Sequence, residues 1–307
     1  MISKFFSQSK PIQYVTMSIV LLLVFVLVKL KAFSSEFEII VIAEQFGLFL
    51  MVLLSLFIFD FFVTRNSLTK KNSYGLYVFV LCFAIFPQTI LHSEVLWANF
   101  FVLLALRRLI SLRSHKHIKK KLFDAAFWIA LASLFYFWAI VFFILVYVAL
   151  LVYRITDPKN YVIPIVGVVT LAIMIVSYLI IKDIEFVSYA SDLIDFSLDF
   201  SLLNTRPFII GTTILLSLGI WSLFFFVKNL RSQMKSYRPS FSLILVVLLL
   251  GFSILVLAPD KNGSELIFLF APLAIIIANY IEVISEIWFK ESLLWILFLT
   301  PIAISLL

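Results

Sequence analysis

The sequence has little charge, glycine, proline or cysteine. Only 13% of its 307 residues are charged whereas 64% are hydrophobic, which excludes a water-soluble globular domain of this size. Phenylalanine occurs 35 times against 7 glycines, and this predicts bulky helix packing rather than close contacts between small residues. The single cysteine, Cys82, excludes an intramolecular disulfide and a thiolate metal cluster. We expect it to be a small packing residue.

Long apolar runs take the place of the missing charge. Continuous runs such as 19–28 favour membrane-spanning helices over short alternating strands. The run 122–153 is too long for one span and is basic at both ends, so two short helices turning near Tyr136 are predicted. The sequence therefore predicts an all-α polytopic integral membrane protein of about eleven transmembrane helices in one domain, 1–307. The other nine spans are expected near 13–33, 45–64, 74–92, 95–112, 161–182, 207–228, 240–258, 265–284 and 291–307.

The basic residues are divided unequally between the two sides of these spans. Nineteen of the 24 Lys and Arg fall on one side, and the rest are Lys29, Lys31, Lys182, Arg206 and Lys261. Because basic loops stay in the cytoplasm, this bias predicts a cytoplasmic N-terminus and an external C-terminus. Orientation and anionic headgroups explain the net charge of +7, and no nucleic-acid partner is implied. The first apolar run lacks a small-residue cleavage site and is expected to remain as a helix.

A basic cluster follows the predicted span 95–112. It contains two of the 3 histidines, His115 and His117, but its positive field opposes a metal cation. Anionic lipid headgroups are one predicted partner of the cluster. Topology determination alone would explain it equally, and a cytoplasmic protein partner is a third option. The residues predicted to bind headgroups are Arg107, Arg108, Arg113, Lys119, Lys120 and Lys121.

Carboxylates gather in the predicted external loops. Glu36 and Glu38 have the i, i+2 spacing that sends both side chains the same way in an extended loop. They could hold a divalent cation or place one carboxylate as a base, or they could simply form a solvated acidic loop. Glu94 lies in a tight turn, as a catalytic acid or as a helix-capping acid beside an N-cap at Ser93.

The longest external loop, about 183–206, contains a further acidic pattern. Asp192, Asp195 and Asp199 lie on one face of a helix, which predicts an amphipathic helix at the membrane interface. Arg206 then opens the next span at the outer surface. Its guanidinium could hold a phosphate bidentately, or the side chain could reach the interface by ordinary snorkelling.

The segment from His92 to Arg154 resembles the membrane module of the GT-C class of glycosyltransferases, which use polyprenyl-phosphate-linked sugars. Glu94 opens a helix that runs through Trp97 to Arg108, and a basic loop and a short hairpin beginning at Asp124 follow. The resemblance suggests a module 1–206 followed by a helical extension 207–307. The first external loop is shorter than in that class, and we expect no soluble acceptor-binding domain after the last span. The residues to which it assigns roles are the acids Glu36, Glu38 and Glu94, and the lipid-phosphate contacts Lys31, Lys182 and Arg206.

As a whole, the sequence resembles an uncharacterised family of bacterial multi-pass inner-membrane proteins. Three functions stay open at this stage, and whether the chain is an enzyme is open with them. The first is transfer of a sugar from a polyprenyl-phosphate donor at the external face, or a non-catalytic descendant of such a transferase. The second is a non-catalytic subunit bound to other membrane proteins of an envelope or secretion assembly. The third is a permease or lipid transporter, which would usually show ionisable groups near the midplane.

Overall fold

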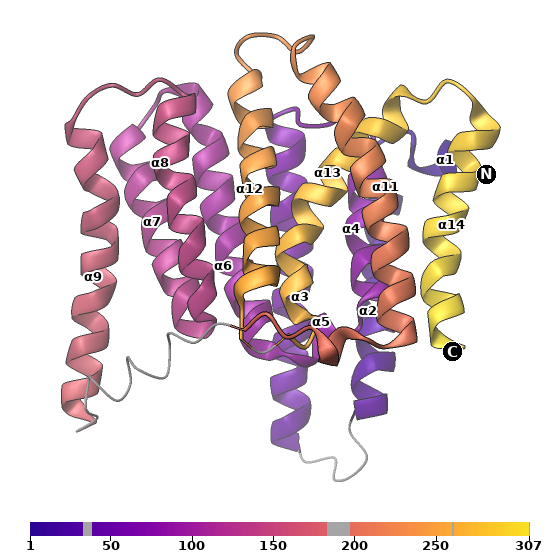
Figure 1. The fold of residues 1–307 in the computed structure, drawn as a ribbon, viewed down its shortest axis with the longest axis horizontal. Coiled ribbons are helices and arrows are strands. Elements are labelled where there is room, and N and C mark those ends of the chain that lie inside the picture. The colour runs from indigo at the N-terminus through magenta and orange to yellow at the C-terminus, as the bar shows by residue number, and fades with distance from the viewer. Residues whose placement is uncertain (33–38, 183–196, 260, 307) are drawn as a thin grey trace.

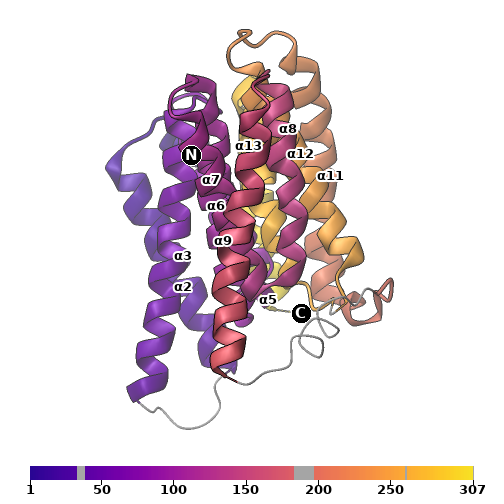
Figure 2. The same cartoon turned by 90° about the vertical axis from the view of Figure 1, so that its left-hand side faces the viewer.

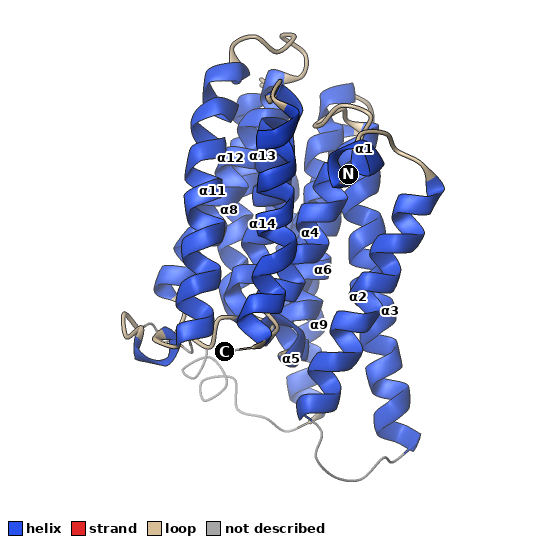
Figure 3. Ribbon diagram, turned by 90° about the vertical axis from the view of Figure 1, so that its right-hand side faces the viewer, coloured by secondary structure: helices blue, strands red, loops and turns tan. Residues whose placement is uncertain are grey.

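The computed structural model describes residues 1–32, 39–182, 197–259 and 261–306, and none of these residues forms a strand (Figure 3). The α-helices are α1 (Ile2–Phe6), α2 (Pro11–Ala32), α3 (Ile39–Arg65), α4 (Tyr74–Ile85), α5 (Gln88–Leu91), α6 (Ser93–Ile110), α7 (Ile118–Phe135), α8 (Phe143–Val152), α9 (Lys159–Ile181), α11 (Arg206–Leu230), α12 (Arg238–Leu257), α13 (Ile267–Val283) and α14 (Ile287–Ser305). The 3-10 helices are η1 (Ser111–Ser114), η2 (Phe137–Phe142), η3 (Ser201–Leu203) and η4 (Ser264–Leu266). The predicted all-α class is confirmed.

Eight segments in the described part of the chain are long and apolar enough to cross a membrane, namely α2, α3, α6 with η1, α9, α11, α12, η4 with α13, and α14. The shorter apolar helices α4 and η2 with α8 stand among them (Figure 1). The N-terminus and the C-terminus lie at opposite ends of this bundle (Figure 1). Length, composition and arrangement are those of a multi-pass helical membrane protein.

The chain reverses direction at Tyr136. Helix α7 ends at Phe135, and the backbone of Tyr136 is extended, with φ −146° and ψ 104°. Helix η2 then leads into α8, which returns beside α7 (Figure 1). The predicted pair of short helices within 122–153 is therefore confirmed, and a single span across this segment is excluded.

The predicted span 74–92 is divided in the structure. Helix α4 ends at Ile85, and the short α5 follows after Phe86 and Pro87. Pro87 has no backbone N–H and disfavours helical geometry in the residue before it, which accounts for the break. With 12 residues, α4 is about 18 Å long, shorter than the roughly 30 Å core of a bilayer. The polar residues that follow the break therefore lie against packed protein and not at the end of a long helix.

Helices α4 and α13 occupy the centre of the bundle. Of the 12 residues of α4, all except Ala84 are buried, and 83% of the apolar window of α13 is buried. Aromatic rings join them to their neighbours, because Phe79 stacks on Phe59 with centroids 4.4 Å apart and Phe83 meets Phe270 at 5.1 Å. Cys82 is buried and unbonded in this centre, as expected of a packing residue.

Two glycines lie where helices approach closely. A Cβ added to Gly167 of α9 would lie 2.9 Å from the Cβ of Ala126 on α7, and one added to Gly251 of α12 would lie 2.9 Å from a methyl of Leu269 on α13. Any side chain would force these helices apart. The expectation that bulky residues rather than small ones set the packing is therefore wrong at these two contacts.

The helix order separates the charges along the bundle. We call the end that carries α1 and the loops 66–73, 111–117, 153–158 and 231–237 the basic end, and the opposite end, with α5, η4 and the C-terminus, the distal end (Figure 1). Nineteen of the 24 Lys and Arg belong to loops or helix ends at the basic end. The charge bias predicted from the sequence is therefore a property of the folded bundle.

Candidate functional site

A polar cluster lies at the distal end, where α5 packs on η4. We call it the distal polar cluster and define it by five residues, Gln88, His92, Asn262, Ser264 and Glu265. The first two flank or belong to α5, and the other three form the turn before α13. His92 Nδ1 and the Asn262 amide nitrogen are 3.5 Å apart, across 170 residues of sequence. The cluster is therefore assembled by tertiary packing.

Gly263 shapes the turn that carries three of these residues. Its φ of +88° is left-handed, and a Cβ at this position would lie 2.8 Å from the ring of Phe208. Only glycine meets both requirements. The Asn262 side-chain oxygen accepts the Ser264 N–H at 2.9 Å, which closes the turn and places Glu265 at the start of α13.

Glu265 is the acidic centre of the cluster and is 1% exposed. Its Oε2 accepts the Gly263 N–H at 3.1 Å, and the backbone N–H groups of Asn262 and Glu265 also face the carboxylate, while Oε1 makes no hydrogen bond of normal geometry to a described residue. The adjoining N-terminus of α13 favours a negative charge at this position. An ionisable side chain buried in a membrane bundle is costly to keep, which makes it a candidate for function.

Two further side-chain oxygens of the cluster are also buried and unpaired. In the described part of the chain, Gln88 Oε1 and Ser264 Oγ are buried without a hydrogen-bond partner. Buried polar atoms are nearly always paired, so three unpaired atoms in one region indicate a missing ligand or water. The carboxylate and amide oxygens accept hydrogen bonds and the serine hydroxyl can do either. The cluster is thus suited to a ligand that presents hydroxyl or ammonium groups.

Lys261 stands beside the cluster as a structural cation. Its ammonium donates to the carbonyls of Val256 at 2.8 Å and Ala258 at 2.9 Å, and also to that of Ser197. It lies 4.6 Å from the centre of the Phe200 ring. Three donors meet three acceptors, so Lys261 closes the end of α12 and supplies positive potential without a free donor for a ligand.

Of the three predicted catalytic acids, only Glu94 lies among the described residues. Glu36 and Glu38, with the divalent cation proposed for them, lie outside the described residues. Glu94 is exposed in the first turn of α6, two residues from His92, and interacts electrostatically with Lys29 of α2. The capping acid is thus placed as expected, but α6 already begins at Ser93 and its N-cap is His92 without a side-chain bond, so the predicted Ser93 cap is wrong. No three or more His, Cys, Asp or Glu side chains that the structure describes are grouped to hold a metal.

The predicted lipid-phosphate residues belong to separate helices. Lys31 lies in the last turn of α2, Lys182 directly follows α9, and Arg206 opens α11, and all three are exposed. Helices α9 and α11 stand apart along the long axis of the molecule, so the structure does not bring these two cations into one site (Figure 1). In the loop before α11, the described residues from 197 onward form an irregular segment and η3. There the Asp199 carboxylate accepts the Ser201 N–H at 2.9 Å. Asp192 and Asp195 lie outside the described residues.

The predicted headgroup cluster lies at the basic end, where most of its members contact the protein. Arg108 forms a 3.0 Å ion pair with Asp124, Arg107 stacks on Phe61, and Arg113 covers Tyr237. Lys121 donates to Ser111 and Ser114. The exposed members are Lys119 and Lys120.

Sequence analysis missed Glu265 and Gln88. Glu265 coincides with the expected start of span 265–284, where it was treated as a boundary residue. Gln88 lay inside the expected span 74–92. A signal was available, because the short polar segment Lys261–Glu265 is dense in polar residues between two apolar runs, and Pro87 precedes Gln88.

Fold and site together define a class: a multi-pass helical membrane protein with a polar cluster around one buried glutamate at the end that carries few basic residues. The chain belongs to a family of unknown function, DUF6427, whose profile matches residues 1–305. No curated protein matches the chain. No solved structure matches it either.

Proposed function

We propose that the chain crosses a bacterial inner membrane eleven times, with its basic end in the cytoplasm and its distal end outside. The eight long apolar segments, together with α4 and α5, α7, and η2 with α8, supply eleven passes of alternating direction. The gathering of Lys and Arg at one end supports the orientation.

This topology is testable with two cysteines, because the native Cys82 is buried. Leu202 at the distal end is 72% exposed, and Met234 at the basic end is 74% exposed. In intact spheroplasts, a membrane-impermeant maleimide should label Leu202→Cys, and it should label Met234→Cys only after permeabilisation. Labelling of Met234→Cys in intact spheroplasts would show that the orientation is the reverse of the one proposed.

We further propose that the distal polar cluster binds the hydroxyl-rich headgroup of a lipid-linked substrate. The function that follows is transfer of a sugar from a polyprenyl phosphate, in the manner of a GT-C-like enzyme or of a descendant that has kept only the binding. The observation that carries the proposal is the set of three buried, unpaired oxygens on Gln88, Ser264 and Glu265. Sugar hydroxyls are the donors that these oxygens lack.

The surroundings of the cluster suit a lipid. Helices α2, α3 and α9 extend beyond α5 at the distal end (Figures 1 and 2). The protruding ends of α3 and α9 carry exposed apolar side chains, and Ile39 of α3 and Ile181 of α9 are 86% and 77% exposed. Hydrocarbon is the solvent that such ends require. A headgroup at the cluster would therefore have its lipid tail beside apolar helix surface.

In the catalytic form of the proposal, a distal carboxylate acts as base. Glu265 or Glu94 would take the proton of an acceptor hydroxyl while the acceptor oxygen bonds to the anomeric carbon of the sugar. The bond from that carbon to the phosphate oxygen breaks, and the polyprenyl phosphate leaves with the electron pair.

The decisive variant is Glu265→Gln, which keeps the shape and removes the charge. We expect the purified variant to retain about tenfold less lipid-linked sugar than the parent, measured by native mass spectrometry, and cell-surface glycans to change. Ser264→Ala should give the same direction of change with a smaller effect. The matched control is Glu286→Gln, because Glu286 is an exposed glutamate at the basic end.

Two of three outcomes would count against the proposal, and the other would decide between its catalytic and non-catalytic forms. If Glu265→Gln accumulates normally, retains lipid-linked sugar and leaves glycans unchanged, the binding proposal fails. If it loses the lipid but glycans stay unchanged, the chain is a binding descendant and not an enzyme. If the parent instead purifies with a membrane partner that protects Leu202→Cys from labelling, an envelope-assembly subunit replaces the substrate proposal.

A further inference from the structure

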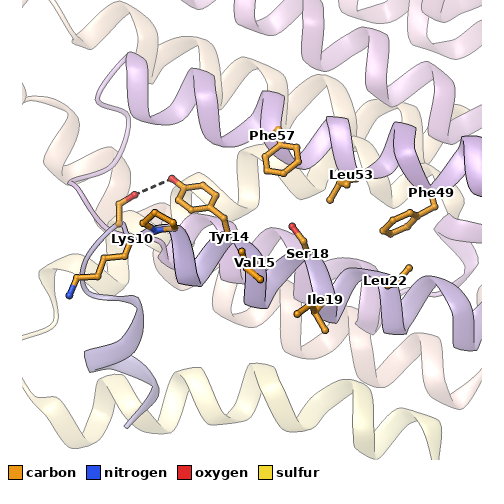
Figure 4. A pocket seen from close by; sticks show the side chains of 11 residues that line it. Lys10, Tyr14, Val15, Ser18, Ile19, Leu22, Phe49, Leu53 and Phe57 are labelled. Atoms are coloured by element: carbon orange, nitrogen blue, oxygen red, sulfur yellow. Dashed lines mark hydrogen bonds between the residues drawn. The ribbon is translucent and has the colours of Figure 1, made fainter.

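A groove of about 690 Å³ lies between α2 and α3, close to the basic end (Figure 4). It forms because α2 packs mainly on α4 and α3 packs mainly on α6, which leaves the two helices only loosely joined to each other. Its volume is within the range of about 300–1,000 Å³ that is usual for ligand sites. Its walls are contributed by Ser9, Lys10, Pro11, Tyr14, Val15, Ser18, Ile19, Leu22, Phe49, Leu53 and Phe57.

The groove changes from polar to apolar along its length. Lys10, Tyr14, Ser18 and Leu22 follow one another at intervals of four residues, so they lie along one face of the chain as it enters and follows α2. On α3, the facing wall is made by Phe57, Leu53 and Phe49, which are spaced in the same way (Figure 4). The polar part is at the basic end and the apolar part points toward the bundle's middle. A phospholipid has the same order of charged headgroup, ester linkage and acyl chain.

Lys10 and Tyr14 line the mouth of the groove, and the Asp60 carboxylate adjoins the mouth behind Tyr14. The Ser9 hydroxyl donates to the Tyr14 hydroxyl at 3.0 Å (Figure 4). Tyr14 in turn donates to Asp60 Oδ2 at 2.8 Å. Thr64 donates to the same oxygen at 3.5 Å, and no described residue bonds to Asp60 Oδ1. The ammonium of Lys10 is exposed at the same mouth. One free carboxylate oxygen and one free ammonium match a headgroup that contains an ammonium and a phosphate.

Ser18 gives a second sign of a ligand. Several serines and threonines of the apolar helices donate to the carbonyl four residues earlier, namely Thr16, Ser55, Thr170 and Ser177. Ser18 makes no hydrogen bond within the described part of the chain, and its hydroxyl faces the groove (Figure 4). It lies one helical turn below Tyr14, the depth at which a lipid's ester carbonyl would accept its proton.

We propose that this groove binds one phospholipid with a primary ammonium headgroup, taken from the leaflet at the basic end. Lys10 contacts the phosphate, Asp60 accepts from the ammonium, and Ser18 donates to an ester carbonyl. The acyl chain lies along Leu22 and Leu53. The site is independent of the distal polar cluster, because it lies at the opposite end of the bundle and shares no residue with it.

The first experiment uses the unaltered chain and changes only the lipid. Nanodiscs are prepared with ethanolamine, N-methylated ethanolamine, choline or glycerol phospholipids of one acyl composition, and bound lipid is counted by native mass spectrometry after delipidation. Choline keeps the positive charge but has no N–H to donate. We expect retention to fall about tenfold from ethanolamine to choline and to be low for glycerol. Equal retention of all four lipids would overturn the proposal.

Variants then assign the contacts. Asp60→Asn should remove the preference for ethanolamine over glycerol lipids, while Lys10→Gln should weaken retention of both. Ser18→Phe should fill the groove and abolish retention. Matched controls at the basic end are Asp157→Asn and Lys235→Gln, whose side chains are exposed.

The variants also distinguish another occupant of the groove. If the Asp60→Asn variant is monodisperse and still prefers ethanolamine lipids, the assignment of Asp60 to the ammonium is wrong. If Ser18→Cys forms a disulfide-linked dimer in membranes, a second copy of the chain covers the groove, and the lipid proposal is wrong.

Discussion

Helices α4 and α13 differ from α2, α9 and α14 in how much of their surface lies inside the protein, although all five are strongly apolar. The apolar window of α13 is 83% buried, whereas those of α2, α9 and α14 are each 22% buried. In water such a difference would follow from hydrophobicity. In lipid it cannot, because the tails around the protein are as apolar as leucine.

Specific contacts separate the central helices from the peripheral ones. Tyr77 on α4 donates its hydroxyl to the Leu294 carbonyl at 2.8 Å, and Asn279 on α13 donates to the Leu68 carbonyl at 2.8 Å. Stacked rings add to these bonds in the centre. Interior positions are thus defined by packing shape and buried polar bonds, which are the forces that remain between helices in a bilayer.

The largest effect should come from emptying the centre. Phe79 is 0% exposed and stacks on Phe59, so Phe79→Ala leaves a cavity that lipid cannot fill. We expect a loss of about 3 kcal/mol, at the lower end of the usual range because the unfolded side chain stays in lipid. Reversible unfolding in mixed micelles measures it. Phe46→Ala is the control, since Phe46 is 60% exposed, and equal losses in both variants would erase the distinction between centre and periphery.

One face of the peripheral helix α9 packs too closely on α7 to accept a larger residue. At Gly167 of α9, a Cβ would meet the Cβ of Ala126 at 2.9 Å and the Phe123 carbonyl at 3.2 Å. We expect Gly167→Ala to cost about 2 kcal/mol, because α7 and α9 must separate. Gly47→Ala is the matched control, since no atom lies within 4 Å of its added Cβ, and it should be neutral or slightly stabilising. A neutral Gly167→Ala would show that α9 is only loosely attached.

Much of the fold could be predicted from the sequence, because a bilayer sets the length of a span and the side on which basic loops stay. Hydropathy located the long helices, and basic flanks located the reversal at Tyr136. The break at Phe86 was missed although Pro87 marks it, since the apolar run continues through it. Burial could not be predicted, because α9 and α13 are similarly apolar and differ only in their neighbours.

The candidate site lies at the same end of the molecule as the predicted catalytic acid Glu94, but its central residue, Glu265, was not predicted. The excess of carboxylates pointed to the distal end, and Glu94 does lie close to the cluster in sequence and structure. Glu265 was missed because its importance depends on burial and on contact between α5 and η4, which are joined only by tertiary packing. The sequence contains no spacing rule that brings Gln88 and Glu265 together.

A smaller effect on stability is expected at Tyr153, whose buried hydroxyl bonds to its neighbours at the edge of the centre. Tyr153 donates to the Ile110 carbonyl at 3.0 Å and lies 2.9 Å from the Ser240 hydroxyl. Tyr153→Phe removes both bonds and should cost about 1 kcal/mol. Unfolding of the two proteins at neutral pH measures the difference, and no loss would show that water replaces the bonds.

The same residue predicts a dependence on pH. Burial raises the pKa of Tyr153 to about 12, above the value of about 10 for a free tyrosine. The neutral phenol therefore stabilises the fold fully below pH 10, and this contribution is lost as the pH rises toward 12. The parent should lose stability more steeply than Tyr153→Phe across that interval, and parallel curves would contradict the assignment.

The smallest effect is expected on the exposed face of α9, and it bears most directly on what surrounds the protein. Ile173 is 62% exposed, so Ile173→Ala in micelles should change stability by less than about 0.5 kcal/mol. The same variant should accumulate normally in cells if lipid alone covers this face. Normal stability in micelles with loss of the protein from cells would instead show that another membrane protein packs on α9. Only in that case would the exposed apolar surface belong to an interface, because lipid contacts do not distinguish isoleucine from alanine strongly enough to remove a stable protein.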